Sequence, residues 1–124
     1  MACTFWEDPD RVLTRAHRAL EEVVKRKAMV TQDEANSGPA RVYAIAFNPP
    51  GRLHWPNLSP SEQIGRASLF TGTVSAYRNP RAHRELDDQP DAALRELLLI
   101  NHLFRLEAEA EVREPVSPVE ITPG

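Results

Sequence analysis

The chain has 124 residues, which is enough for one domain with a single core and too few for two. Hydrophobic residues make up 41% and charged residues 27%, and the formal net charge of −3 argues against a broad, charge-driven grip on duplex DNA or an anionic membrane. The single cysteine excludes a disulfide framework, no apolar run reaches the ~18–20 residues of a membrane span, and no signal-peptide pattern is present. We therefore expect a cytoplasmic protein.

The first predicted helix spans about residues 9–28. Asp8 is a suitable N-cap, Pro9 fits the first helical position, and apolar residues follow at helical spacing. Residues 31–39 have the composition of a turn, and a short helix is predicted at about 39–47. Residues 48–60 contain four prolines and a glycine, which predicts an irregular surface connection.

The next predicted helix, at about 60–79, organises the chain. Ser59, Pro60 and Glu62 form the pattern of a capping box, which fixes the start of the helix. The predicted apolar face consists of Ile64, Ala67, Phe70 or Thr71, Val74 and Tyr77. Because a residue that precedes proline disfavours helical geometry, we expect the helix to end or kink at about Arg78, before Pro80.

Small residues form a stripe along the same helix: Gly65, Ser68, Gly72, Ser75 and Ala76. Glycine in a helix interior costs about 1 kcal/mol relative to alanine, so a packing reason is expected. Two interpretations remain open. The stripe packs against another helix of the same chain, or it is a contact surface for a second copy.

The last predicted helix begins at Pro90 and runs to about residue 111, with a wide leucine-rich face. Residues 113–124 contain three prolines and are expected to be an extended or disordered tail. The sequence therefore predicts an all-α fold, a small bundle of three long helices plus a short one within residues 1–112, followed by that proline-rich tail.

Polar side chains gather where the organising helix is predicted to stop: Arg78, Asn79, Arg81, His83, Arg84 and Glu85. An arginine at a helix end can bind a phosphate or carboxylate with two N–H groups, and a histidine that follows a proline can fold back over the same place. Asn79 can orient the imidazole or a substrate oxygen. Arg78, Asn79 and His83 are the candidate catalytic residues, and Arg81 and Arg84 are weaker candidates for substrate binding.

The spacing of an arginine and a histidine carries little information by itself, because it also occurs at Arg11–His17 and at Arg95–His102 inside predicted helices. Only its context distinguishes the third match: an asparagine and then a proline follow Arg78, and a second arginine lies between Arg78 and His83. A simpler interpretation is that Arg78 and His83 only cap the end of the helix.

The segment LFTGTVSAYRNPRAHREL and the leucine-rich helix after it (DDQPDAALRELLLINHLFRLEAE) resemble the bacterial Ymh-type family of uncharacterised proteins, within the HEPN superfamily of small helical bundles. The resemblance is close over residues 62–107. It implies a further helix before the one near Asp8, so this chain is expected to be a shortened version or part of a longer protein. Many HEPN domains are metal-independent endoribonucleases that work as dimers, with an Arg-polar-x-x-x-His motif from each subunit in a shared cleft.

The resemblance maps that motif onto Arg78, Asn79 and His83 and assigns no role to Arg81, Arg84 or Glu85. It implies attack of a ribose 2′-OH on the adjacent phosphate, with the histidine as general acid or base and the arginine on the phosphate. The implied products are a 2′,3′-cyclic phosphate and a 5′-OH, the substrate is single-stranded or looped RNA, and the protein is a homodimer. The implied setting is a toxin or phage-defence effector with an antitoxin or associated effector protein as partner.

A non-catalytic HEPN module remains the alternative. Such a module would bind RNA or nucleotide, or serve as a dimerising or regulatory subunit of a larger defence complex, and the acidic balance favours it modestly. No cofactor is expected, and no metal, because no spacing of His, Asp or Glu matches a zinc or calcium pattern. His17 is interpreted as a residue at the boundary of the apolar face, and Trp55 as an anchor rather than a base-stacking residue.

Overall fold

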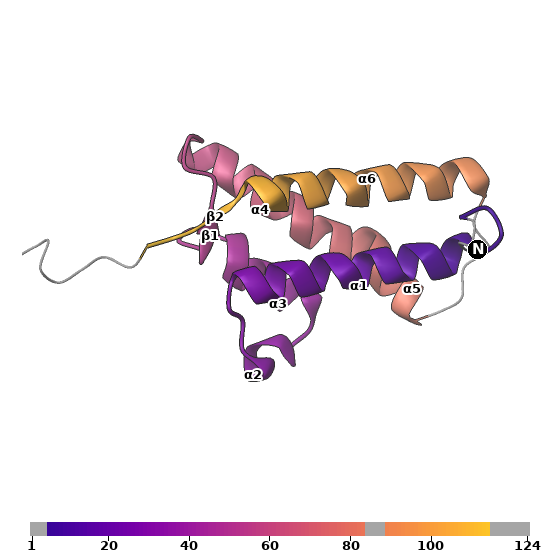
Figure 1. Ribbon diagram of the computed structural model, residues 1–124, viewed down its shortest axis with the longest axis horizontal. Coiled ribbons are helices and arrows are strands. Elements are labelled where there is room, and N and C mark those ends of the chain that lie inside the picture. Colours follow the sequence, from indigo (N-terminus) through magenta and orange to yellow (C-terminus); the bar gives the residue numbers. More distant parts are fainter. Residues whose placement is uncertain (1–4, 84–88, 115–124) are drawn as a thin grey trace, which may run out of the picture.

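The computed structural model describes residues 5–83 and 89–114, and this part of the chain is a helical bundle (Figure 1). In chain order the elements are α1 (Pro9–Lys27), α2 (Gln32–Ala35), α3 (Pro39–Phe47), β1 (Leu53–His54), α4 (Pro60–Thr73), the π-helical turn η1 (Val74–Arg78), α5 (Asn79–His83), α6 (Pro90–Glu109) and β2 (Glu111–Val112). The prediction of a small all-α bundle is confirmed. In the described ranges, no helix has the length and apolar character needed to cross a membrane.

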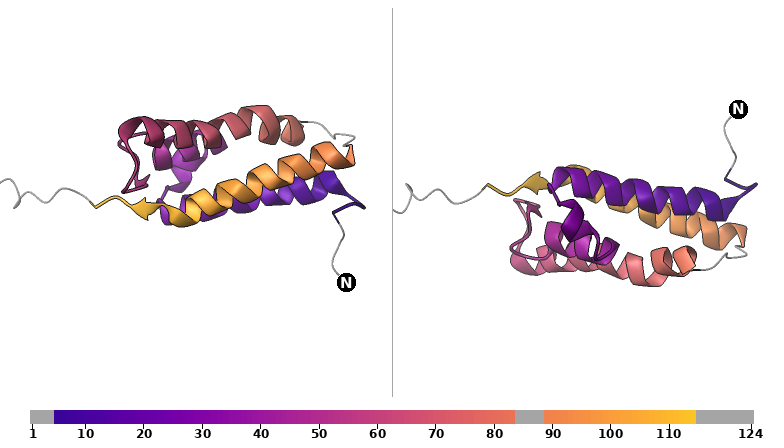
Figure 2. Two further views of the ribbon diagram at one scale, coloured as in Figure 1. Left: turned by 90° about the horizontal axis from the view of Figure 1, so that it is seen from above. Right: turned by 90° about the horizontal axis from the view of Figure 1, so that it is seen from below.

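Two layers make up the bundle (Figure 2). Helices α1 and α6 lie side by side and run in the same direction, while α4 and α5 run the opposite way in the second layer (Figures 1 and 2). Helix α3 packs against both α1 and α4 and so connects the layers. The start of α1, the start of α6 and the whole of α5 therefore meet at one end of the bundle.

The predicted helix starts are confirmed, and the reason is local hydrogen bonding. The Asp8 side chain accepts a hydrogen bond from the backbone of Arg11 at the start of α1, and Ser59 and Glu62 form the expected capping box at the start of α4. A second capping box, between Thr31 and Glu34, forms the one-turn helix α2 within the segment predicted as a turn.

A small antiparallel sheet joins the predicted irregular connection to the end of α6, and the sequence did not predict it. Leu53 pairs with Val112 and His54 pairs with Glu111. The interaction continues beyond the strands, where the Arg113 side chain donates a hydrogen bond of 2.7 Å to the carbonyl of Gly51. The predicted tail begins here at residue 113, and residues 115–124 lie outside the described part.

The prediction that the organising helix ends at about Arg78 is wrong, and what interrupts its regular α-geometry there is a π-turn. Helix α4 passes through the π-turn η1 into α5, and Pro80 lies inside this continuous helical segment. The backbone N–H of Asn79 donates to the carbonyl of Val74, five residues earlier. The wider π-turn gives the proline ring room that a regular α-turn lacks, so the chain stays helical where the sequence pattern predicts a stop.

The π-turn also changes which side chain faces inward. It places one extra residue in a single turn, which delays the rotation of the helix. Tyr77, predicted on the apolar face, is 41% exposed, whereas Arg78 turns inward and its side chain is only 23% exposed. Ile64, also predicted on that face, is 55% exposed. The inward face of this helix is therefore apolar before the π-turn and arginine-bearing after it.

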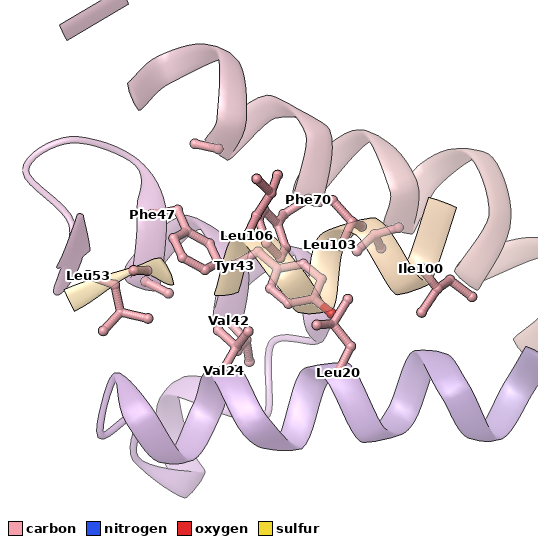
Figure 3. Packing of buried hydrophobic residues seen from close by; sticks show 14 of the residues in the cluster. Leu20, Val24, Val42, Tyr43, Phe47, Leu53, Phe70, Ile100, Leu103 and Leu106 are labelled. Atoms are coloured by element: carbon pink, nitrogen blue, oxygen red, sulfur yellow. The ribbon is translucent and has the colours of Figure 1, made fainter. Parts of the chain in front are cut away.

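Aromatic rings fill the middle of the core (Figure 3). Phe47 stacks on Phe70 with ring centroids 4.3 Å apart and on Trp55 at 5.1 Å. The indole N–H of Trp55 donates a hydrogen bond of 2.8 Å to the carbonyl of Leu106, and the side chain is 3% exposed. Trp55 is thus an anchor, as the sequence predicts.

The small-residue stripe of α4 and η1 faces outward. All five of its residues are exposed, and a Cβ atom added at Gly65 or Gly72 would meet nothing within 4 Å in the described structure. Packing of the stripe inside the subunit is therefore excluded for this part of the chain. Leu69, which lies beside it, is 45% exposed.

Candidate functional site

Arg78, the last residue of the π-turn, points toward α1 and binds Glu21. Its Nε donates a hydrogen bond of 2.8 Å to Glu21 Oε2, and its Nη2 donates one of 3.4 Å to Oε1. The guanidinium thus meets both carboxylate oxygens, in the two-point geometry that it also uses for a phosphate. The two side chains are 23% and 17% exposed, so the ion pair is accessible from solvent.

A pocket of about 400 Å³ opens beside this ion pair, between α1, α3 and Arg78. The wall from α1 carries four charged residues at helical spacing, Arg18, Glu21, Glu22 and Lys25. Glu22 pairs with Lys25 at 3.4 Å, while Arg18 makes no ion pair with any described residue. With three cations and two carboxylates, the pocket carries excess positive charge although the whole chain has a net charge of −3.

The opposite wall of the pocket includes the start of α3. Gly38 is the N-cap of this helix and has no side chain to accept a hydrogen bond, and Pro39 follows it. The N–H groups of a first helical turn have no partner within the helix, and the helix dipole adds partial positive charge there. The start of α3 therefore adds to the positive character that Arg18 gives the pocket.

Tyr43 lies beneath the ion pair in the core. Burial raises the pKa of its hydroxyl strongly and the charge of Glu21 raises it further, while the charge of Arg78 acts in the opposite direction. The side chain is 3% exposed and makes no hydrogen bond with any described residue. It is therefore a neutral hydroxyl group close to the Arg78–Glu21 pair.

The structure does not bring His83 to this pocket. His83 is exposed at the end of α5, five positions after Arg78, and does not line the pocket wall. Neither His83 nor the side chain of Asn79 has a hydrogen bond to a described residue. Within one subunit, then, Arg78 and His83 lie on one helix but do not form a shared site in the described structure.

Arg81 has a structural position that does not fit substrate binding. Its Nε and Nη2 donate to the two carboxylate oxygens of Glu96, at 2.7 and 2.8 Å, and its Nη1 donates to Asp10 at 2.7 Å. Its side chain is 3% exposed. We therefore correct the expectation for Arg81, which holds α5 to α1 and α6. Arg84, the other weak candidate, lies outside the described residues.

His17 belongs to the same buried cluster, which corrects its interpretation as a boundary residue. It is 3% exposed, and its Nε2 lies 2.9 Å from Glu96 Oε2. Burial alone would raise the pKa of Glu96, but hydrogen bonds from Arg81 and His17 lower it below the ordinary value of 4.5. A narrow gap of about 20 Å³ borders His17, Arg78 and Arg81, so the cluster lies directly behind the Arg78 site.

Comparison with known proteins identifies a family. A family model described as a protein of unknown function (Hypoth_ymh) matches residues 9–106, which is more than half of the chain. The chain belongs to the Hypoth_Ymh family. No curated protein and no solved structure matches it. The region matched by the Hypoth_Ymh family contains Arg78, Asn79 and His83, together with the carboxylates of Asp10, Glu21 and Glu96 that bind Arg78 and Arg81.

Sequence reasoning missed the residues that bind the two arginines. Glu21 is one of several acidic residues on the first helix, and only the fold shows that it meets Arg78. One signal was present. Glu21 and Glu22 each lie three or four residues from both Arg18 and Lys25, which predicts a single charged helix face. Glu96 gave a weaker signal, as a carboxylate within the leucine-rich face of the last helix.

Proposed function

We propose that this Hypoth_Ymh protein is a metal-independent endoribonuclease of HEPN type. The observation that carries the proposal is the position of Arg78, which is held in two-point geometry at the edge of an accessible, positively charged pocket while the exposed imidazole of His83 follows on the same helix. An arginine with an exchangeable anionic partner suits phosphate binding, and an exposed imidazole suits proton transfer.

The proposed reaction is attack of a ribose 2′-OH on the adjacent phosphate. His83 takes the proton from the 2′-OH or gives a proton to the departing 5′-oxygen. Arg78 binds the phosphate and stabilises the additional negative charge of the transition state. The Asn79 amide hydrogen-bonds the imidazole or the sugar hydroxyl. The products are a 2′,3′-cyclic phosphate and a 5′-OH, and the substrate is single-stranded or looped RNA.

One histidine cannot easily be both base and acid in the same turnover, so we propose a homodimer that brings two sites together. The exposed small-residue stripe supports this, because small side chains allow two helices to approach closely. Exposed apolar residues extend the same surface on α4 and η1 and include Ile64, Leu69 and Tyr77. Leu98 of α6, 57% exposed, is a further apolar residue without cover in the described structure.

The test is cleavage of mixed single-stranded RNA in the presence of EDTA. We expect His83→Ala to lower the rate by about 10²–10⁴-fold, because it removes the proton-transfer group. His102→Ala is the matched control, since His102 is also an exposed histidine on a helix, α6, and we expect a change of less than about twofold. Equal cleavage by wild type and His83→Ala, with both dimeric by light scattering, would reject the proposed chemistry.

A second candidate is a non-catalytic HEPN module that binds RNA or nucleotide, or that dimerises within a larger defence complex. The closed Arg78–Glu21 pair and the separation of Arg78 from His83 favour this function. The same assay decides, because RNA binding without cleavage by a folded wild-type dimer would select the second candidate. A role as a toxin or phage-defence effector, restrained by an antitoxin or another partner, follows for either candidate from the HEPN resemblance.

A further inference from the structure

Two arginines on the same helical segment have carboxylate partners, but only one partner can be exchanged. The Arg81–Glu96 pair is enclosed, with side chains 3% and 6% exposed. The Arg78–Glu21 pair is 23% and 17% exposed and borders the pocket of about 400 Å³. An anion can therefore reach the Arg78 guanidinium without unfolding any element, whereas it cannot reach that of Arg81.

The pocket provides what an anion needs in order to replace Glu21. Arg18 lines it without an ion-pair partner in the described structure, so a phosphate that enters meets one cation that no carboxylate neutralises. The displaced carboxylate also has a new partner. Lys25 lies four residues after Glu21 on α1, and a glutamate placed four residues before a lysine is the favourable order on a helix.

We propose that the Glu21 carboxylate is a built-in competitor that occupies Arg78 until a phosphate oxyanion of RNA replaces it in the pocket between α1 and α3. In the resting state, Arg78 is bound to Glu21. In the ligand-bound state, the phosphate takes the two-point contact and Glu21 turns toward Lys25. An anion that binds Arg78 more weakly than Glu21 does therefore does not displace Glu21. The inference rests on the proposed function only in taking RNA phosphate as the anion.

The variant Glu21→Gln tests the competition, because it keeps the shape of the side chain and removes its charge. The matched control is Glu109→Gln, which removes one charge from an exposed arginine–glutamate pair outside the pocket. The probe is a fluorescein-labelled single-stranded 2′-O-methyl RNA oligonucleotide, and its dissociation constant is measured by fluorescence anisotropy at low, fixed salt concentration. Thermal melting of each variant is measured in parallel.

We expect Glu21→Gln to bind the oligonucleotide about three- to tenfold more tightly than wild type, since the competing ion pair is lost. Glu109→Gln should change the dissociation constant by less than about twofold. The gain should disappear in the double variant Glu21→Gln/Arg78→Gln, because the released guanidinium is its source. If that double variant does not fold, Glu21→Gln/Arg78→Lys replaces it, and a reduced gain is expected because lysine lacks the two-point contact.

Three results would overturn the inference: unchanged or weaker binding by Glu21→Gln, an equal gain for Glu109→Gln, or no binding by any variant. A purely structural role for Glu21 predicts the first of these, together with a lower melting temperature. The probe has no free 2′-OH and cannot be cleaved, so its binding does not depend on the proposed chemistry. A gain with Glu21→Gln but no cleavage of unmodified RNA by wild type would reject the ribonuclease and keep the inference. Cleavage that depends on His83, without tighter binding by Glu21→Gln, would keep the ribonuclease and reject the inference about Glu21.

Discussion

The two ends of the bundle are stabilised by different interactions. At the end near the small sheet, the buried rings of Phe47 and Phe70 stack in the core (Figure 3), and Phe47 also stacks on Trp55. At the end where α1 and α6 begin (Figure 1), the buried side chains include Arg81 and Glu96, which form an ion-pair cluster. Apolar packing stabilises the fold in proportion to the surface area buried and tolerates small shifts of the side chains. A bidentate ion pair, in contrast, fixes the relative orientation of its two side chains.

This difference indicates what each end does. A buried ion pair contributes little net stability relative to a well-packed apolar pair, but breaking it leaves an uncompensated charge and is costly. Its value at this end is the orientation of α5, the helix that carries His83. We infer that the aromatic end provides most of the folding free energy and that the charged end positions the candidate site.

The largest effect is expected at the aromatic end. Phe70 is fully buried and contacts the rings of Phe47 and Tyr43, so Phe70→Ala should lower the free energy of unfolding by about 3–5 kcal/mol. Urea denaturation followed by circular dichroism measures this change. The control is Leu69→Ala, next in sequence and 45% exposed, for which a change within about 1 kcal/mol is expected. Similar losses for the two variants would contradict the assigned core.

The next largest effect is expected at the charged end. Glu96→Gln keeps the side-chain shape but removes the carboxylate that binds two N–H groups of the buried Arg81, so the free energy of unfolding should fall by about 3 kcal/mol. The control is Asp91→Asn on the same helix, which breaks the exposed pair between Asp91 and Arg95. A change within about 0.5 kcal/mol is expected there, because the side chains of that pair are 76% and 72% exposed. An unchanged free energy of unfolding for Glu96→Gln would contradict the expected cost of breaking this cluster.

Acid should weaken the charged end before the aromatic end. The pKa of Glu96 lies below its ordinary value in the folded state, because Arg81 and His17 bind the charged form despite burial. The unfolded chain therefore takes up this proton at higher pH, and the stabilisation is present above about pH 4.5 and lost as pH falls through the lowered folded pKa. When wild type and Glu96→Gln are denatured at a series of pH values between 7 and 3, the difference between their free energies of unfolding should become smaller as the pH falls. A difference that stays constant would assign the pH dependence to other carboxylates.

The sequence predicted the helix starts because their signals are local. The Ser59 and Glu62 capping box and the N-cap at Asp8 involve residues within one turn of each other, so a short stretch of sequence determines the outcome. The sheet could not be predicted in this way. Its strands have two residues each and lie far apart in sequence, and only the packed bundle brings Leu53 to Val112.

The candidate site was predicted only in part, for a similar reason. The cluster around Pro80 was identified from sequence, but Arg78 and Arg81 are chemically equal in a sequence and differ only in surroundings. One borders an open pocket through Glu21, and the other is enclosed by Glu96. Burial and partner depend on contacts between α1, α5 and α6, which no local pattern encodes. The continuation of the helix past Pro80 was missed because the steric rule for proline assumes regular α-helical bonds.

The π-turn gives the residues before and after it different helical phases. Up to Val74, the direction of each side chain follows the regular α-helical repeat counted from Ser59. Beyond Val74, the π-turn displaces this repeat by one residue. The number of residues in this helix therefore decides which side chain meets Glu21, as much as the identity of the residue at position 78. Deletion of a single residue within the π-turn would remove the extra residue and bring a different side chain to the pocket. An alignment of relatives should therefore place its one-residue gaps at this turn, and the arginine should keep its distance from the proline rather than from the start of the helix.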